Sequence, residues 1–401
     1  MKLQDAQQTV GHFLSPLTVD QFLDEVLLGG FAKIGGNRQA GRTDLLGADP
    51  QSALLEAVHL APKLTFHSAN ASGPPPSLAG VRDRADFQER IAEFHARHYS
   101  VRFPELRPLS SALEHLGRAL EALLHQPVTA SAFWSRGGLR APVHCDDHDL
   151  LVVQLRGAKR WLIARKASGL ENTWKGIPGE PPELGDHESL DLLPGDLLYL
   201  PRGTFHSVDS DVESLHLSIG FTPLTVREAV IAALDHLSDA DRTLRMTAGN
   251  RLAFQLRGAG IERFGPLVME SLARLAGACR TPGFLNEALQ RRSARAIGWL
   301  QATPAAACVT EISLDTVLVH RDTAFCHLTA NPDKIDFAYP GGHLYIHRGA
   351  EESVLYIANT TRFAVRDIPG GLRDDARLSL ARRFVEVGFL EPASDAPAPS
   401  A

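Results

Sequence analysis

Three side chains that commonly bind metal ions have a suggestive arrangement in this sequence: His144, Asp146 and His206. His144 and Asp146 flank Cys145, just before the apolar run Leu150–Leu155, which predicts a strand. Because alternate residues of a strand point to the same face, this imidazole and this carboxylate would enter the same space. A second histidine from a neighbouring strand would complete a two-histidine, one-carboxylate set, which leaves coordination positions open on non-haem Fe(II).

The second histidine closes the motif Leu193–His206, LPGDLLYLPRGTFH. Pro194-Gly195-Asp196 predicts a turn, Leu197–Leu200 predicts a buried strand, and Pro201-Arg202-Gly203 predicts a second turn. This order presents His206 at the mouth of a strand. An isolated HxD motif occurs by chance, whereas HxD in a β-rich region followed by PGDxLYxPxGxxH is far more specific. The two motifs together predict the three metal ligands.

An Fe(II) oxygenase needs an electron source, and 2-oxoglutarate is a common one. That molecule chelates the metal and needs a cation for its distal carboxylate. Lys159 follows the turn Arg156-Gly157-Ala158 and begins the next predicted strand. A buried lysine there would be well paired by a carboxylate. A surface lysine beside Arg160 is an equally good interpretation from the residues alone.

The elements that must position these residues are short β-type runs separated by turns. Such a series favours a sandwich or barrel. The runs are Val128–Trp134, Leu150–Leu155, Arg160–Ala164, Leu197–Leu200 and Leu215–Phe221. The polar stretch Gly169–Asp186 is interpreted as an excursion from the barrel. The first 125 or so residues carry helical patterns over Asp86–His98 and Ser110–Leu124 but no chemical motif, so we expect them to serve as scaffold.

From Thr225 the sequence is helical, and these helices have Leu and Ala stripes suited to packing or oligomerisation. Further on, two helical patterns with flanking β-type runs, Ser353–Asn359 and Arg373–Val387, suggest a winged-helix-like module. We therefore expect four segments. They are a barrel with its α/β lead-in over residues 1–224, helices over 225–302, the winged-helix-like domain over 303–392 and a disordered tail over 393–401.

The composition excludes several classes of protein. The chain has 401 residues, a net charge of −6 and a pI near 6.3, which does not suggest a general binder of nucleic acid or anionic membranes. Its 4 cysteines are widely spaced without a CxxC pair, as expected in a reducing compartment. No long apolar run resembles a membrane span, and the start, MKLQDAQQTV, lacks a signal-peptide core. We expect a cytoplasmic protein.

The HxD motif, the run Gln154–Trp161 and PGDLLYLPRGTFH together resemble the cupin-type JmjC hydroxylases. Within that group the sequence is most similar to the ribosomal oxygenases, which use Fe(II), 2-oxoglutarate and O2 to hydroxylate arginine or histidine side chains of ribosomal proteins. The resemblance implies an α+β fold with a JmjC double-stranded β-helix (the cupin jelly roll). It also implies a helical dimerisation segment, hence a homodimer, and a C-terminal winged-helix-like domain.

The resemblance also assigns residues. The three metal ligands fall on the metal triad of the family, and Lys159 falls on the basic residue that binds the distal carboxylate of 2-oxoglutarate. His216 and Ser218 lie two apart in a late strand segment that lines the same pocket. Ser131, on the strand before HxD, is near a position that often carries a polar side chain. We expect these four residues to contact the cosubstrate.

Two residues depart from the family pattern. Cys145 stands where these enzymes tend to have an aromatic residue, and Ala141 offers no hydroxyl to the cosubstrate. Both changes bear on the identity of the substrate.

We expect hydroxylation of an Arg- or His-type side chain in a ribosomal protein or other polypeptide. Alternatives are a hydroxylase of a peptide natural-product precursor or small molecule, and a metal-binding cupin without redox chemistry, against which Lys159 argues. The mixed charges over Arg373–Glu386 favour protein contacts over specific nucleic-acid binding.

Overall fold

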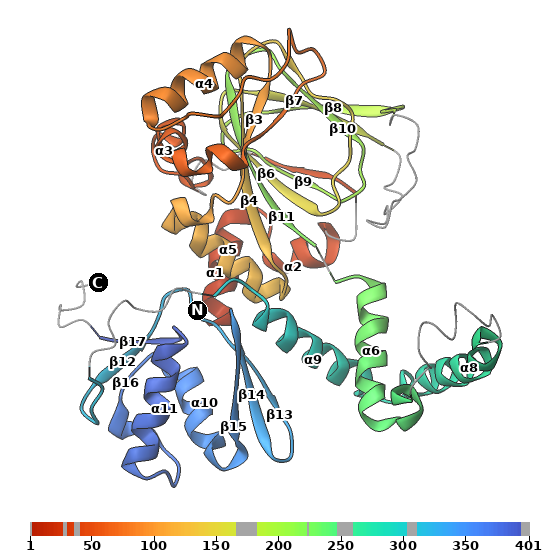
Figure 1. Cartoon of the computed structure of the whole chain (residues 1–401), viewed down its shortest axis with the longest axis vertical. Helices are drawn as coiled ribbons and strands as arrows, with labels where there is room; N and C mark the ends of the chain where they lie inside the picture. The colour runs from red at the N-terminus through yellow and green to blue at the C-terminus, as the bar shows by residue number, and fades with distance from the viewer. Residues whose placement is uncertain are drawn as a thin grey trace. The chain divides into compact units, whose positions relative to one another are not determined.

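The computed structural model describes residues 2–26, 30–35, 41–165, 183–222, 224–246, 260–302 and 311–393 (Figure 1). The chain forms two compact units, Met1–Pro223 and Leu224–Ala401. Two sequence predictions lie outside the described residues: most of the excursion at 169–186 and nearly all of the tail at 393–401. Within the described ranges, no helix has the length and apolar character needed to cross a bilayer.

Two antiparallel sheets form the centre of the first unit. The larger has the strand order β1-β9-β6-β11-β4-β3-β2, and the smaller has the order β5-β10-β7-β8. The strands are β1 (Ala32–Ile34), β2 (Thr65–His67), β3 (Ser100–Phe103), β4 (Val128–Ser135), β5 (Leu139–Arg140), β6 (Asp149–Arg156), β7 (Lys159–Ala164), β8 (His187–Leu192), β9 (Leu197–Leu200), β10 (His206–Ser210) and β11 (Ser214–Phe221). Each of the five predicted strands is confirmed to within one residue at either end.

The two sheets enclose a common apolar interior. One cluster of buried residues takes Leu150 and Val152 from β6, Leu198 from β9, Trp161 from β7 and Val208 from β10. β6 is buried on both faces except at its last residue, because its other face is covered within the unit. This explains why its sequence is a continuous apolar run without polar alternation.

Helices cover the larger sheet: α4 packs on β3 and α5 packs on β4 (Figure 1). α5 begins after Ser110, whose side chain accepts a hydrogen bond from the Leu113 amide, as expected of an N-cap. The helices of this unit are α1 (Leu3–Leu14), α2 (Val19–Gln21), α3 (Pro50–Glu56), α4 (Arg84–Ala96) and α5 (Ser111–Leu124). The helical patterns predicted over 86–98 and 110–124 are thereby confirmed.

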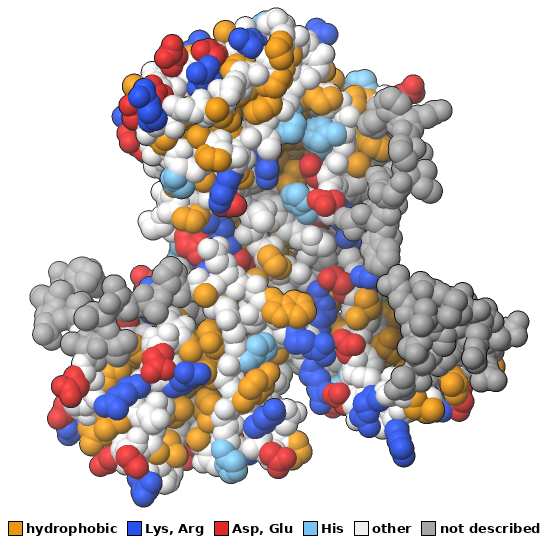
Figure 2. Space-filling model, viewed as in Figure 1, with side chains coloured by type: hydrophobic (Ala, Val, Ile, Leu, Met, Phe, Trp, Pro, Cys, Tyr) orange, Lys and Arg blue, Asp and Glu red, His pale blue; other side chains and the backbone are white. Residues whose placement is uncertain are grey.

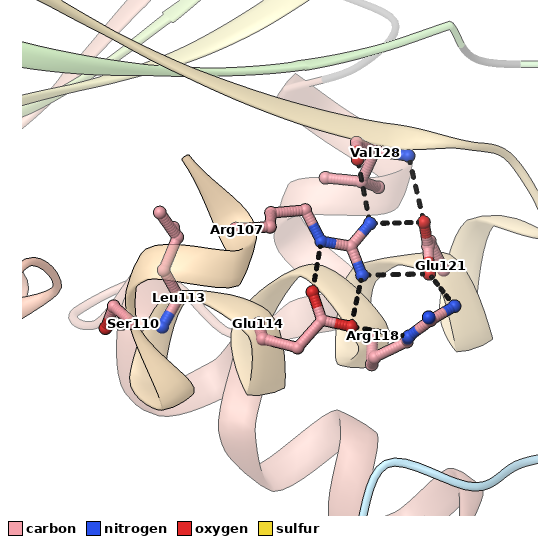
Figure 3. Close-up of polar contacts among 7 residues, drawn as sticks. All are labelled: Arg107, Ser110, Leu113, Glu114, Arg118, Glu121 and Val128. Atoms are coloured by element: carbon pink, nitrogen blue, oxygen red, sulfur yellow. Dashed lines mark hydrogen bonds and ion pairs between the residues drawn. The ribbon is translucent and has the colours of Figure 1, made fainter. Parts of the chain in front are cut away.

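A buried ion network fastens α5 to the start of β4 (Figure 3). Arg107 donates to Glu114 at 2.8 Å and to the carbonyl of Val128 at 2.8 Å, and it also pairs with Glu121. Arg118 bridges the same two carboxylates, at 2.8 and 3.1 Å. Two guanidinium groups pair with two carboxylates in this network. The charges are therefore compensated and hydrogen-bonded, as charges removed from water must be.

The second unit begins with helices and continues with two small sheets. Its helices are α6 (Val226–Ala240), α8 (Gly260–Ala278), α9 (Phe284–Gly298), α10 (Glu351–Asn359) and α11 (Asp374–Glu386). One sheet has the order β13-β14-β15 and the other β16-β12-β17. The strands are β12 (Val317–His320), β13 (His327–Ala330), β14 (Lys334–Tyr339), β15 (Gly342–His347), β16 (Arg362–Ala364) and β17 (Leu390–Pro392). Phe337, Phe384 and Phe389 meet in its core, with Phe337 4.8 and 4.9 Å from the other two rings.

Candidate active site

The structure brings the three predicted metal ligands together at the mouth of the barrel. One ligand atom from each of His144, Asp146 and His206 lies within 4.8 Å of the others. His206 is the first residue of β10, and it forms an isolated antiparallel bridge with His144, with N–O distances of 3.0 and 2.8 Å. The two rings are 4.3 Å apart, and the His206 Nε2 atom lies 3.6 Å from the Asp146 carboxylate.

The backbone conformation that brings Asp146 into this cluster differs from the prediction. Strand alternation was expected to aim His144 and Asp146 in the same direction, but Asp146 lies in a loop before β6. Its carbonyl accepts a hydrogen bond of 2.7 Å from the Gly203 amide in the second turn of the Leu193–His206 motif. Contact between these two distant segments therefore places the carboxylate.

Backbone hydrogen bonds hold both imidazoles in a ligand-ready form. The Nδ1 atom of His144 is 2.9 Å from the Pro142 carbonyl, and that of His206 is 3.0 Å from the Thr204 carbonyl. A carbonyl can only accept, so each Nδ1 carries a proton, and Nε2 is the ring nitrogen left to face a metal ion. Burial, followed by the proximity of His144, lowers the pKa of His206 to about 4, which keeps it neutral near pH 7.

The three ligands open into a cavity of about 380 Å³ between the two sheets. Figure 2 shows a hollow on this unit with histidine side chains beside it. The smaller sheet contributes Leu139, Lys159, Trp161, His206 and Val208. The larger sheet contributes Thr65, His67, Ser100, Arg102, Thr129, Ser131, Phe133, Leu150, His216, Ser218 and Gly220.

Lys159 is a buried residue that lines this cavity, with 2% of its surface exposed. Its Nζ atom donates to the Phe133 carbonyl at 3.1 Å and lies 2.9 Å from His216 Nδ1. In the part of the chain that the structure describes, no carboxylate is paired with it. Burial lowers its pKa to about 7, because the charged form has no anionic partner. The interpretation as an exposed lysine is wrong.

The other predicted cosubstrate contacts line the same cavity. Ser131 on β4 and Ser218 on β11 are register partners, and His216 lies two residues before Ser218 on β11. His216 stacks on Phe133 with ring centroids 4.9 Å apart. Burial, followed by the nearby Lys159, lowers the pKa of His216 well below its usual value, so it is a neutral acceptor for the lysine. The sequence predicted the position of Ser131 along its strand only to within about one residue.

Sequence reasoning missed one wall of the cavity. Thr65 and His67 on β2 and Ser100 and Arg102 on β3 all line it, although the first 125 residues were interpreted as scaffold. The available signal was polar residues two apart in each short strand, which point to one face. His148 also lines the cavity, whereas Cys145 is half-buried.

The donor set fits Fe(II) and a chelating cosubstrate. Two imidazoles and one carboxylate form the ligand class of non-haem iron sites with open positions. The unpaired Lys159 lies in the same cavity and suits the distal carboxylate of a dianion.

Comparison with known proteins defines the class first. Residues 110–229 match the sequence model of the JmjC domain, and this region contains the barrel strands β4–β11 and all three candidate metal ligands. This part of the chain is therefore similar to a JmjC domain, and its strands form a cupin-type barrel.

Within this class the chain is similar to ribosomal oxygenases. It is 28% identical over 140 residues to ribosomal oxygenase 2 of Rattus norvegicus, covering 34% of this chain and 30% of that protein. It is 33% identical over 132 residues to the uncharacterized protein YxbC of Bacillus subtilis, covering 28% of this chain and 39% of that protein. The chain thus spans between 30 and 39% of these relatives.

One solved structure covers nearly the whole chain. It is YcfD, a ribosomal oxygenase from Escherichia coli, in complex with cobalt and 2-oxoglutarate. It has a TM-score of 0.51 and 15% identity, and covers 94% of this chain and 98% of that one. At this identity the match establishes a shared fold.

Proposed function

We propose that the protein is an Fe(II)- and 2-oxoglutarate-dependent oxygenase that hydroxylates an Arg- or His-type side chain in a ribosomal protein or other polypeptide. One observation carries the proposal: a two-histidine, one-carboxylate cluster shares one cavity with a buried lysine that has no carboxylate partner among the described residues. The likeness to ribosomal oxygenase 2 supports the polypeptide substrate.

In this proposal His144, Asp146 and His206 hold the iron, and Lys159 binds the distal carboxylate of 2-oxoglutarate. Bound together with O2, these groups supply oxidative decarboxylation to succinate and CO2 coupled to hydroxylation of a C–H bond. The protein's contribution is orientation. Trp161 stacks on His206 at 5.5 Å and fixes its ring, while Ser131, His216 and Ser218 offer polar contacts around the cosubstrate.

The test is a mass measurement. Ribosomes and candidate peptides are incubated anaerobically with the protein, Fe(II) and 2-oxoglutarate, then exposed to air and digested with trypsin. A peptide gaining one oxygen atom, about 16 Da, only with all components supports the proposal. Loss of this mass shift in the Asp146→Ala variant would assign the hydroxylation to this site. If no peptide shifts in ribosomes that lack prior modification, the ribosomal substrate is wrong.

We further propose a homodimer formed by the helical segment at 225–302. Exposed apolar side chains on α6 support this, including Val226, Val230 and Ile231, which are 82, 50 and 40% exposed. A second copy of the chain would cover this face. Sedimentation analysis should give the mass of two chains, and Val230→Asp should shift the protein towards one.

For residues 303–392 we propose a winged-helix-like domain, supported by α10 and α11 beside the three-stranded sheet β16-β12-β17. We place the barrel and its lead-in at 1–224. We also propose a cytoplasmic location, which the free thiols of Cys145, Cys279 and Cys326 support.

A further inference from the structure

One cation in the cavity, Arg102, is not among the residues that the proposed function assigns to the metal or the cosubstrate. Arg102 on β3 lines the cavity and is the register partner of Phe133 on β4. Its Nη2 atom donates to Ser131 Oγ at 2.9 Å. The side chain is half-buried, and among the described residues no carboxylate is within ion-pair distance of it. Its remaining N–H donors are available to a ligand.

The charges of the loaded site leave Arg102 uncompensated. Among the described residues that line the cavity, Asp146 is the sole carboxylate, while Lys159 and Arg102 are both cations. Fe(II), Asp146 and a 2-oxoglutarate dianion together have one net negative charge, which Lys159 balances. The guanidinium of Arg102 then remains as an excess positive charge inside a partly desolvated cavity.

The position of Arg102 points to the substrate side of the cavity. Its wall consists of β2 and β3, and there Thr65 and His67 are exposed, so this wall extends towards solvent. His67 is close enough to the metal ligands for them to influence it. Partial burial, then His144 and then Arg102, lower its pKa, whereas Asp146 raises it. Arg102 and the three candidate iron ligands line the same cavity, so a side chain bound against this wall would lie beside Arg102.

We propose that Arg102 is a specificity-determining residue that admits side chains with a carboxylate, a carboxamide or a neutral imidazole and rejects arginine and lysine. A guanidinium offers a planar fork of donors that matches such acceptors. A second cation would meet like charge in a cavity where water screens poorly. The inference rests on the proposed function, and it narrows the Arg-or-His expectation by excluding arginine.

The test measures binding near the metal without turnover. The protein is loaded with Mn(II) and 2-oxoglutarate at about pH 8, where free histidine is neutral. The probes are the N-acetyl methylamides of Asp, Asn, His and Arg. Paramagnetic Mn(II) accelerates the proton relaxation of any probe bound beside it, so titration ranks the four probes by affinity. Calorimetric titration with 2-oxoglutarate is run separately on the same protein.

We expect the Arg probe to bind at least about tenfold more weakly than the Asp and Asn probes. Arg102→Glu should invert this order, and Arg102→Met, which keeps the apolar stem, should abolish it. Arg160→Met is the matched control, because Arg160 lies on the same barrel but pairs with Asp191 outside the cavity. This variant should bind like the wild type.

Two results would overturn the inference while leaving the proposed function in place. One is an Arg probe that binds as tightly as the others to wild-type protein, and the other is no relaxation effect from any probe. An unchanged ranking in both Arg102 variants would also refute it. Failure of 2-oxoglutarate itself to bind the metal-loaded protein would instead overturn the proposed function, and this inference with it.

Discussion

Binding of 2-oxoglutarate should weaken as the pH rises above 7, because Lys159 must be protonated to pair with the distal carboxylate. Burial without an anionic partner lowers the pKa of Lys159 to about 7 in the free protein. A bound carboxylate favours the charged form and so raises that pKa. Below pH 7 the lysine is already charged. Above it, each binding event must also recruit a proton, so affinity is lost as the pH rises.

The size of the effect follows from the free-state pKa. The protonated fraction falls from about one half at pH 7.0 to about 3% at pH 8.5, so the dissociation constant should rise about 16-fold, or about 1.6 kcal/mol. In this window His206 stays neutral because its pKa is about 4. Calorimetry of Zn(II)-loaded protein in buffers of different ionisation enthalpy should show uptake of about 0.9 proton at pH 8.

Substitution of the lysine separates this effect from other causes. Lys159→Met should weaken binding at pH 7 at least about 30-fold, because the carboxylate then enters a buried site without a partner. It should also remove the pH dependence. Arg160→Met, next along β7, should change neither property. Binding that is independent of pH in the wild type, or the same slope in Lys159→Met, would refute the reasoning.

Three further predictions concern the metal site and the frame around it. His206→Ala should weaken Zn(II) binding at least about 100-fold, whereas Asp147→Ala, at an exposed residue beside the site, should not; equal affinities in metal titrations would contradict the ligand assignment. Glu121→Gln should lower the free energy of unfolding in urea by about 3–5 kcal/mol, since two buried guanidinium groups lose an anion; a loss below about 1 kcal/mol would show that the network matters little. Gly157→Ala should cost at least about 2 kcal/mol, because φ is +64° and the added Cβ would lie 2.0 Å from the Glu213 carbonyl oxygen; an unchanged melting temperature would show that the turn can adapt.

The barrel was predictable because its signals are local. Period-two and continuous apolar runs located its strands, and turn residues such as Gly195 and Gly203 separated them. The cluster of His144, Asp146 and His206 was also predictable from the sequence, since the HxD and PGDxLYxPxGxxH motifs pair a short-range pattern with a second histidine. The loop conformation of Asp146 was not predictable, because a hydrogen bond to the distant Gly203 determines it.

The substrate wall was missed for a related reason. β2 and β3 are short, and their residues matter only because β3 adds to β4 at the edge of the larger sheet. That pairing joins two strands with α5 between them in the chain, and the sequence pattern of β3 alone does not reveal it. The burial of Arg118 and Glu121 on α5 was hidden in the same way, since charged residues on an amphipathic helix normally predict an exposed face.

The most direct test of the central proposal is the release of labelled CO2 from 2-oxoglutarate labelled at C1. Wild-type protein should release it only when Fe(II) and O2 are both present, with an equal amount of succinate. His144→Ala and Asp146→Ala should release none. No release from wild-type protein that binds both Fe(II) and 2-oxoglutarate, or undiminished release from the two variants, would contradict the assignment of this cavity as an oxygenase active site.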